Sequence, residues 1–216
     1  MASYITDNYA KVSVNTELSI LDDNLAEHIE KLFIMECAGP EVDTLSLQTV
    51  SLDVHVYQLH GRTLTDQETI ALEEDGSYSA KITETPSRFL DGLWENLVFD
   101  DGIKDKLLHF ISSVMLFSER QVDFRVVTWN RIILLHGPPG SGKTSLCRAL
   151  AHKLSIRLSR RFSRGQIIEI NSHSLFSKWF SESGKLVGQL FEEIHRILDD
   201  EDVFVCILIG LKNPES

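Results

Sequence analysis

The sequence lacks a long apolar run. The longest one, Val203 to Ile209, is about a third of the length that a transmembrane helix needs. The first residues carry no basic stretch followed by an apolar one, so no secretory signal is predicted. We therefore expect a chain with no membrane partner.

Cysteine is also scarce. Cys37, Cys147 and Cys206 are odd in number, far apart and in no C-x-x-C pattern, which argues against a disulfide framework. We predict that they are reduced thiols. The eight histidines show no H-E-x-x-H or paired metal-ligand spacing, so the sequence predicts no intrinsic metal site.

Positive charge is nearly missing from the first part of the chain. Residues 1–100 hold 5 Lys/Arg and 19 Asp/Glu, a net charge of −14, whereas residues 101–216 hold 16 and 13, a net charge of +3. This asymmetry predicts two domains with different partners. An acidic surface repels phosphates, so no direct nucleic-acid binding is expected. The acidic residues suit a basic protein partner, or they only keep the domain soluble.

Residues 1–95 are predicted to form a small α+β domain. Apolar residues spaced along 18–34 predict a helix, and alternation over 49–59 predicts a strand. No catalytic constellation is present there, because its many carboxylates follow no pattern of acid–base chemistry.

The second part contains a phosphate-binding loop. Residues 137–144 fit G-x-x-x-x-G-K-[ST], preceded by an apolar run at 132–136 that predicts a strand and followed by Leu146, Leu150 and Leu154 on one helical face. The loop predicts triphosphate binding through backbone N–H groups, with a lysine on the phosphates and a threonine on Mg²⁺. The predicted nucleotide contacts are Gly137, Pro138, Pro139, Gly140, Ser141, Gly142, Lys143, Thr144 and Ser145, with Thr144 as the Mg²⁺ contact.

Further elements predict an α/β domain over residues 96–216. Helices are expected at 103–117 and 187–198, and parallel strands at 167–170 and 203–209. Four arginines occur in an eight-residue span: Arg157, Arg160, Arg161 and Arg164. They predict either a solvated connector or a subunit-interface or nucleotide-sensing element.

Two stretches carry a family resemblance. One is Leu135 to Cys147, which contains the loop, and the other is Glu169 to Leu186, with the letters EINSHSLFSKWFSESGKL. Together they resemble the pachytene checkpoint protein 2 family of AAA+ ATPases. The second stretch is the more discriminating, because many protein families share the loop. The resemblance implies ATP and Mg²⁺ as cofactors. It also implies a pore loop in which Lys178, Trp179 and Phe180 grip a substrate chain.

The resemblance further implies partners and a location. Members form a homo-hexamer that unfolds HORMA-domain proteins, directly or through an adaptor. They act in meiotic recombination and chromosome-axis control and in spindle-checkpoint silencing. The nucleus is the expected location, with the cytoplasm as a second one. Residues 1–95 correspond to the substrate- and adaptor-binding domain, and residues 96–216 to part of the ATPase domain.

The chain departs from the family after its third strand. The family has an Asp-Glu pair there, which holds Mg²⁺ and activates water. This chain has Gly210, Leu211 and Lys212 instead. The sequence therefore predicts an incomplete P-loop domain that cannot hydrolyse ATP and whose strand 132–136 lacks in-sheet neighbours. A truncated product, a splice form or a faulty gene model would explain this. The alternative function is a non-catalytic binding module or dominant-negative isoform that binds partners through residues 1–95.

Overall fold

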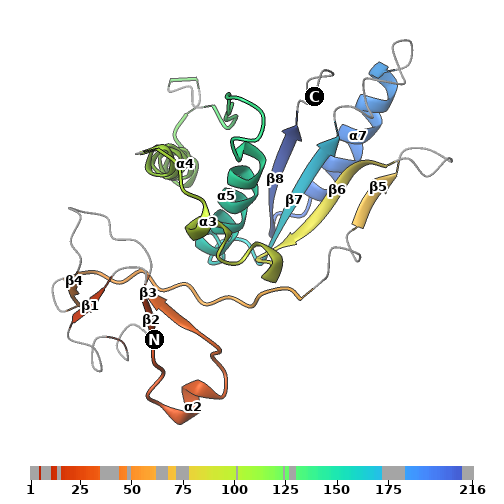
Figure 1. Cartoon of the computed structure of the whole chain (residues 1–216). Helices are drawn as coiled ribbons and strands as arrows, with labels where there is room; N and C mark the ends of the chain where they lie inside the picture. Colours follow the sequence, from red (N-terminus) through yellow and green to blue (C-terminus); the bar gives the residue numbers. More distant parts are fainter. Residues whose placement is uncertain are drawn as a thin grey trace. The chain divides into compact units, whose positions relative to one another are not determined.

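The computed structural model forms two compact units, residues 1–55 and 56–216, which are drawn in Figure 1. The predicted domain boundary at residues 95 and 96 lies inside the second unit. Within the described part of the chain, no helix combines the length and apolar character that crossing a bilayer requires. The described residues are 5, 11–13, 16–34, 44–47, 50–61, 68–71, 78–100, 102–123, 125–126, 130–171 and 183–210.

The first unit is built from short antiparallel pairs. Strand β1 (Lys11–Ser13) pairs with β4 (Thr44–Ser46), and β2 (Thr16–Leu18) pairs with β3 (Leu32–Ile34). A one-turn helix, α2 (Asp23–Ala26), lies between β2 and β3. Three side chains form the buried centre of the unit: Ile5, Leu18 and Leu47.

The predicted helix over 18–34 is wrong. The Asp22 carboxylate accepts hydrogen bonds from the backbone N–H groups of Asn24 and Leu25, which starts a helix there. That helix ends after one turn, and the flanking apolar residues pair as strands. The predicted strand over 49–59 is also wrong for its described part, because residues 51–59 belong to no strand. Alternating side chains need a paired neighbour to make a strand, and none of the described strands pairs with this segment.

The second unit is organised by a four-stranded sheet in the order β5-β6-β7-β8. Strands β5 (Glu68–Ala71), β6 (Tyr78–Thr85) and β7 (Arg164–Asn171) are antiparallel neighbours, whereas β8 (Val203–Gly210) runs parallel to β7. This confirms the α/β class, with a mixed sheet in place of a purely parallel one. The predicted strands at 167–170 and 203–209 are both present.

Helices cover both faces of this sheet (Figure 1). Helix α7 (Ser183–Leu198) packs Leu190 and Ile194 against Ile168 and Ile170. On the other face, helix α5 (Lys143–Arg157) places Ala151 against Ile167. The alternation of β7 side chains between the two helices buries both faces of the strand.

The remaining helices pack against α5. A short 3-10 helix, η2 (Arg88–Leu90), precedes α3 (Leu93–Asn96), and α4 (Ile103–Glu119) confirms the predicted helix at 103–117. Only part of the predicted apolar face of α4 is buried: Leu107, Ile111 and Val114 are buried, whereas Ile103 and Phe110 are exposed. The buried residues Leu107 and Ile111 of α4 therefore pack against the apolar residues of α5.

The predicted strand at 132–136 is wrong, since residues 131–136 form no strand. Ile132 is 77% exposed and Leu134 is 83% exposed. A strand needs a hydrogen-bonding neighbour. None of the described strands supplies one, because β8 is paired only with β7 among them.

Candidate nucleotide-binding site

Two glycines shape the loop that precedes α5. Gly140 and Gly142 have φ values of 77° and 80°, in the left-handed region that other residues enter only at a cost of about 1 kcal/mol. Gly142 is also the N-cap of α5, and it has no side chain that could accept from the helix. The sequence pattern thus fixes glycine where the backbone must curl into the helix.

The first turn of α5 presents free backbone donors. The Leu146 N–H donates to the Gly142 carbonyl at 2.8 Å, and this is the first turn's opening intrahelical bond. The N–H groups of Lys143, Thr144 and Ser145 precede it, and the first N–H groups of a helix have no intrahelical acceptor. The helix dipole adds about half a positive charge at this end. Such a terminus suits an anion, and a phosphate above all.

The Lys143 ammonium lies over the loop. Its Nζ donates to the Gly137 carbonyl at 2.9 Å, to the Pro138 carbonyl at 2.6 Å and to the Ser141 hydroxyl at 3.1 Å. A positive charge is therefore held where the loop backbone turns around it. Phosphate oxygens are stronger acceptors for an ammonium than neutral carbonyls, because the hydrogen bond is charge-assisted.

The residues around the loop fit a nucleotide-bound Mg²⁺ better than an intrinsic metal. Thr144 is exposed at the start of α5, so its hydroxyl can serve as one oxygen ligand. Among the residues that the structure describes, no group of three His, Cys, Asp or Glu side chains is placed to hold a metal ion. Mg²⁺ keeps several waters and binds through phosphates, so one hydroxyl is a sufficient protein contribution.

Phe99 packs against the loop, a contact that the sequence pattern did not predict. A Cβ added at Gly142 would lie 3.3 Å from Phe99 Cζ. The neighbouring Val98 is 92% exposed. Glycine is therefore favoured at position 142 for two reasons: the backbone is left-handed there, and the Phe99 ring leaves little room for a side chain. The only sequence signal was the apolar run at 97–99, which is too short to indicate a role.

Trp94 on α3 packs against α5 within the second unit. Its side chain is buried with Leu107, Leu146 and Leu150. The ammonium groups of Lys104 and Lys153 lie 5.3 and 5.1 Å from its ring centroid, within cation–π range. These contacts fix α3 against both α4 and α5.

Arg148 and Glu169 join α5 to β7. Arg148 Nε and Nη2 donate to the two Glu169 carboxylate oxygens at 2.7 and 2.6 Å. This fork geometry is the strongest form of a side-chain ion pair. The hydrogen bonds to Glu169 raise the pKa of Arg148 above its ordinary value. Sequence analysis missed this pair, since 21 residues separate its members and no local pattern marks it.

His152 on α5 is a buried histidine next to this framework. It is 6% exposed, and its Nε2 has no hydrogen-bond partner among the described residues. Burial lowers the pKa of His152, against smaller raising effects of Asp91, Glu95 and a hydrogen bond to the Ser87 backbone, while Lys153 lowers it slightly further. The imidazole is therefore neutral in the folded protein at neutral pH.

We expect acid to destabilise the second unit through His152. The unfolded chain binds a proton near the ordinary histidine pKa of about 6.5, before the buried ring does. Stability is thus fully present above that pH and is lost as the pH falls through the lowered folded pKa. Urea unfolding of His152→Gln should show a weaker loss between neutral and mildly acidic pH. The control His109→Gln, at an exposed position of α4, should keep the wild-type profile. Identical profiles for all three proteins would contradict the assignment.

Other predicted features have mixed outcomes. Lys178, Trp179 and Phe180 lie outside the described residues, so their pore-loop role stays a prediction. In the arginine-rich span, Arg164 at the start of β7 forms an ion pair with Asp200 at 2.6 Å, and Arg161 lies over the Phe162 ring. Cys147 and Cys206 are free thiols as predicted, and burial raises the pKa of Cys206 to about 11. Cys37 is outside the described residues.

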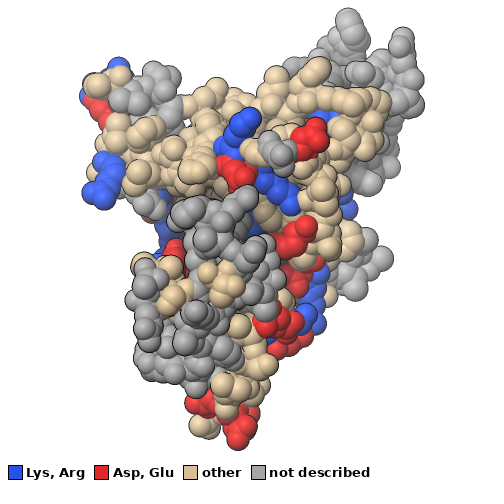
Figure 2. All heavy atoms as spheres, turned by 60° about the vertical axis from the view of Figure 1, so that its left-hand side comes forward, with Lys and Arg blue, Asp and Glu red and all other residues tan. Residues whose placement is uncertain are grey.

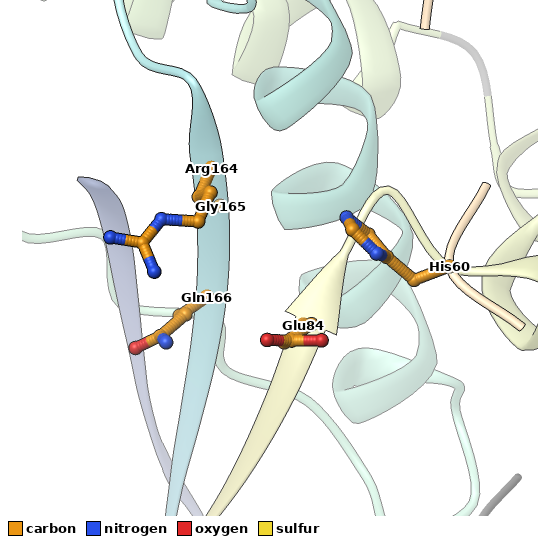
Figure 3. A pocket seen from close by; sticks show the side chains of 5 residues that line it. All are labelled: His60, Glu84, Arg164, Gly165 and Gln166. Atoms are coloured by element: carbon orange, nitrogen blue, oxygen red, sulfur yellow. The ribbon is translucent and has the colours of Figure 1, made fainter. Parts of the chain in front are cut away.

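A small pocket lies at the amino end of β7 (Figure 3). It is lined by His60, Glu84, Arg164, Gly165 and Gln166. Gly165 and Gln166 lie at the amino end of β7, where Ser155 near the end of α5 approaches the strand. The loop lies at the amino end of α5, whereas the pocket lies near its carboxyl end. This pocket therefore takes no part in phosphate binding.

Comparisons with known proteins place the loop in a family. A family model described as "ATPase family associated with various cellular activities (AAA)" matches residues 133–209, and one described as "TRIP13 N-terminal domain" matches residues 1–62. A pachytene checkpoint protein 2 homolog of Danio rerio is 47% identical over 188 residues, which cover 86% of this chain and 43% of that protein. This chain belongs to the pachytene checkpoint protein 2 family.

Other relatives agree. The pachytene checkpoint protein 2 homolog of Homo sapiens is 44% identical over 207 residues, covering 95% of this chain and 43% of that protein. A solved structure titled "Structure of C. elegans PCH-2" has a TM-score of 0.71 at 36% identity and covers 96% of this chain and 52% of that one. The chain thus spans about two-fifths of the length of the curated relatives that it matches.

Proposed function

We propose that this chain binds ATP with Mg²⁺ at residues 137–145. The observation that carries the proposal is the Lys143 ammonium held over a glycine-shaped loop at the amino end of α5. In this arrangement the free N–H groups of the first turn would hold phosphate oxygens, and Lys143 would exchange its carbonyl acceptors for them. Thr144 would contribute its hydroxyl to the nucleotide-bound Mg²⁺. The match to the AAA family supports this assignment.

We expect ATP binding without turnover. No carboxylate lies between Val203 and Pro214, where the family resemblance implies an Asp-Glu pair. Without that pair, no residue at the end of β8 can activate the attacking water. The test is phosphate release by the purified chain with ATP and Mg²⁺, measured beside Lys143→Ala. Equal background release from both proteins is expected. Release above the Lys143→Ala level would show that another group activates water.

The proposed partners are HORMA-domain proteins and their adaptor. In this proposal the chain acts in the meiotic and spindle-checkpoint processes of its family, in the nucleus and also in the cytoplasm, in association with homo-hexamers. Two observations support it: the relatives are pachytene checkpoint proteins, and residues 1–62 match the TRIP13 N-terminal domain.

Among the described residues of the first unit, those around α2 form a surface that suits a protein partner. Its acidic side chains include the exposed Asp23, Glu27 and Glu30. Figure 2 shows acidic atoms gathered at the lower tip, where α2 lies in Figure 1. Two exposed apolar residues, Leu21 and Phe33, belong to the same segment. Acidic groups around apolar anchors suit a partner with a basic rim and an apolar centre.

We expect the full chain to capture a purified HORMA-domain protein in the presence of its adaptor. The variant Leu21→Asp/Phe33→Asp should lose most of this capture, because it places carboxylates at the apolar centre. The matched control is Ile103→Asp/Phe110→Asp, which changes exposed apolar residues of α4 in the other unit. Equal capture by all three proteins would contradict the assignment of this surface.

The same capture experiment distinguishes the alternative function. Two observations favour a binding module that works without an ATPase cycle: the absent acidic pair, and the segment 131–136, which pairs with none of the described strands. Capture that persists in Lys143→Ala and without ATP would support the module. Capture that requires both ATP and Lys143 would support a nucleotide-controlled remodeller.

A further inference from the structure

The Arg148–Glu169 pair is placed between the phosphate-binding loop and the end of the central strand. Arg148 is four residues after Thr144, so the two side chains lie on one face of α5, one turn apart. Glu169 is two residues before Asn171, the last residue of β7. The pair therefore connects the first turns of α5 to the carboxyl end of β7.

The pair is partly shielded from water. The Arg148 side chain is 34% exposed and the Glu169 side chain is 19% exposed. Glu169 lies opposite Lys81 on β6 and Leu208 on β8, so its strand is held on both sides. A shielded, bidentate pair on a central strand is more rigid than a surface ion pair, which is screened and loses side-chain entropy when it forms.

The other contacts between α5 and β7 differ in kind. Ala151 packs against Ile167, and Ser155 approaches the backbone at Gly165. Apolar packing is non-directional and tolerates small sliding movements. The guanidinium–carboxylate fork fixes both distance and orientation. A displacement of the first turns of α5 would therefore reach β7 chiefly through Arg148.

We propose that Arg148 and Glu169 are positioning residues that transmit nucleotide occupancy from the loop to the carboxyl end of β7. The inference rests on the proposed function, because it requires a ligand at Lys143 and Thr144. The strand end matters because the chain continues from Asn171 into residues 172–182, which contain the predicted grip residues 178–180. The ion pair thus gives the nucleotide loop a direct connection to the segment that is predicted to hold substrate.

Amide hydrogen exchange of the full chain tests this connection. ATP with Mg²⁺ should slow exchange in the β7 peptide 166–171 of the wild type by about threefold or more, since a ligand that tightens an element reduces its local opening. Arg148→Met and the nearly isosteric Glu169→Gln should lose this effect. Their ATP affinities, measured by calorimetry, should stay within about threefold of the wild type, because neither residue contacts the loop donors.

Arg164→Met is the matched control, since it breaks another Arg–carboxylate pair on the same strand, that with Asp200. It should keep the ATP effect on peptide 166–171. The inference is overturned if both variants of the pair keep the effect, or if Arg164→Met loses it equally. A wild type that binds ATP with no change in β7 exchange also overturns it, while the proposed function stands. A wild type that binds no ATP overturns both.

Discussion

Replacement of Lys143 by alanine should weaken ATP binding by about 100-fold or more, which corresponds to about 3 kcal/mol. The Lys143 ammonium is the charge that the structure holds over the loop, through hydrogen bonds to the Gly137 and Pro138 carbonyls. A charge-assisted hydrogen bond to phosphate contributes about twice as much as a neutral one. The backbone donors of α5 remain in the variant, so weak residual binding is expected.

Calorimetric titration with ATP and Mg²⁺ measures this effect. The control is Lys106→Ala, which removes an exposed lysine of α4 and should leave the affinity unchanged. Lys143→Ala also removes three hydrogen bonds within the loop, so its urea unfolding midpoint is compared with that of the wild type. Unchanged affinity in a folded Lys143→Ala protein would exclude the loop as the nucleotide site.

Replacement of Gly165 by alanine should destabilise the second unit by about 3 kcal/mol or more, the range of severe core overpacking. An added Cβ would lie 2.5 Å from Thr85 Oγ1, 2.7 Å from Ser155 Cβ and 3.1 Å from the Thr85 carbonyl oxygen. These atoms belong to β6 and to α5, so neither neighbour can retreat without moving a whole element. Gly165 thus leaves no room for a Cβ between β6 and α5.

The unfolding free energy in urea tests this prediction. The control is Gly188→Ala in α7, where an added Cβ meets no atom within 4 Å. Alanine is favoured over glycine inside a helix by up to about 1 kcal/mol, so Gly188→Ala should stabilise the protein slightly. A small effect for Gly165→Ala would mean that α5 can move away from β7 at little cost.

Long periodic elements were predictable from the sequence. Helices α4 and α5 were found from apolar residues at helical spacing, whereas β7 and β8 were found as short runs rich in apolar residues. The loop was predictable for another reason: its chemistry needs glycine at fixed positions, and glycine at 140 and 142 indeed adopts positive φ. A backbone conformation that requires glycine at a fixed position can be recognised from the sequence alone.

Features that depend on distant residues were not predictable. The apolar residues over 18–34 have helical spacing, but Leu18 and Leu32 instead face each other across the β2–β3 pair, and no local pattern reveals that pairing. The segment 132–136 has strand composition, but strand formation depends on neighbours that no local pattern reveals. The Phe99 contact with Gly142 and the ion pair of Arg148 with Glu169 arise only when the chain folds, since each joins residues more than 20 positions apart.

The surroundings of Trp94 make it an optical reporter of the folded core. Its indole is 8% exposed and lies close to two ammonium groups, those of Lys104 and Lys153. Both exclusion of water and nearby charge change the emission wavelength of an indole. A chain with Trp129→Phe and Trp179→Phe would emit from Trp94 alone. Its fluorescence would then report how closely α5 packs against the rest of the second unit. No added label would be needed.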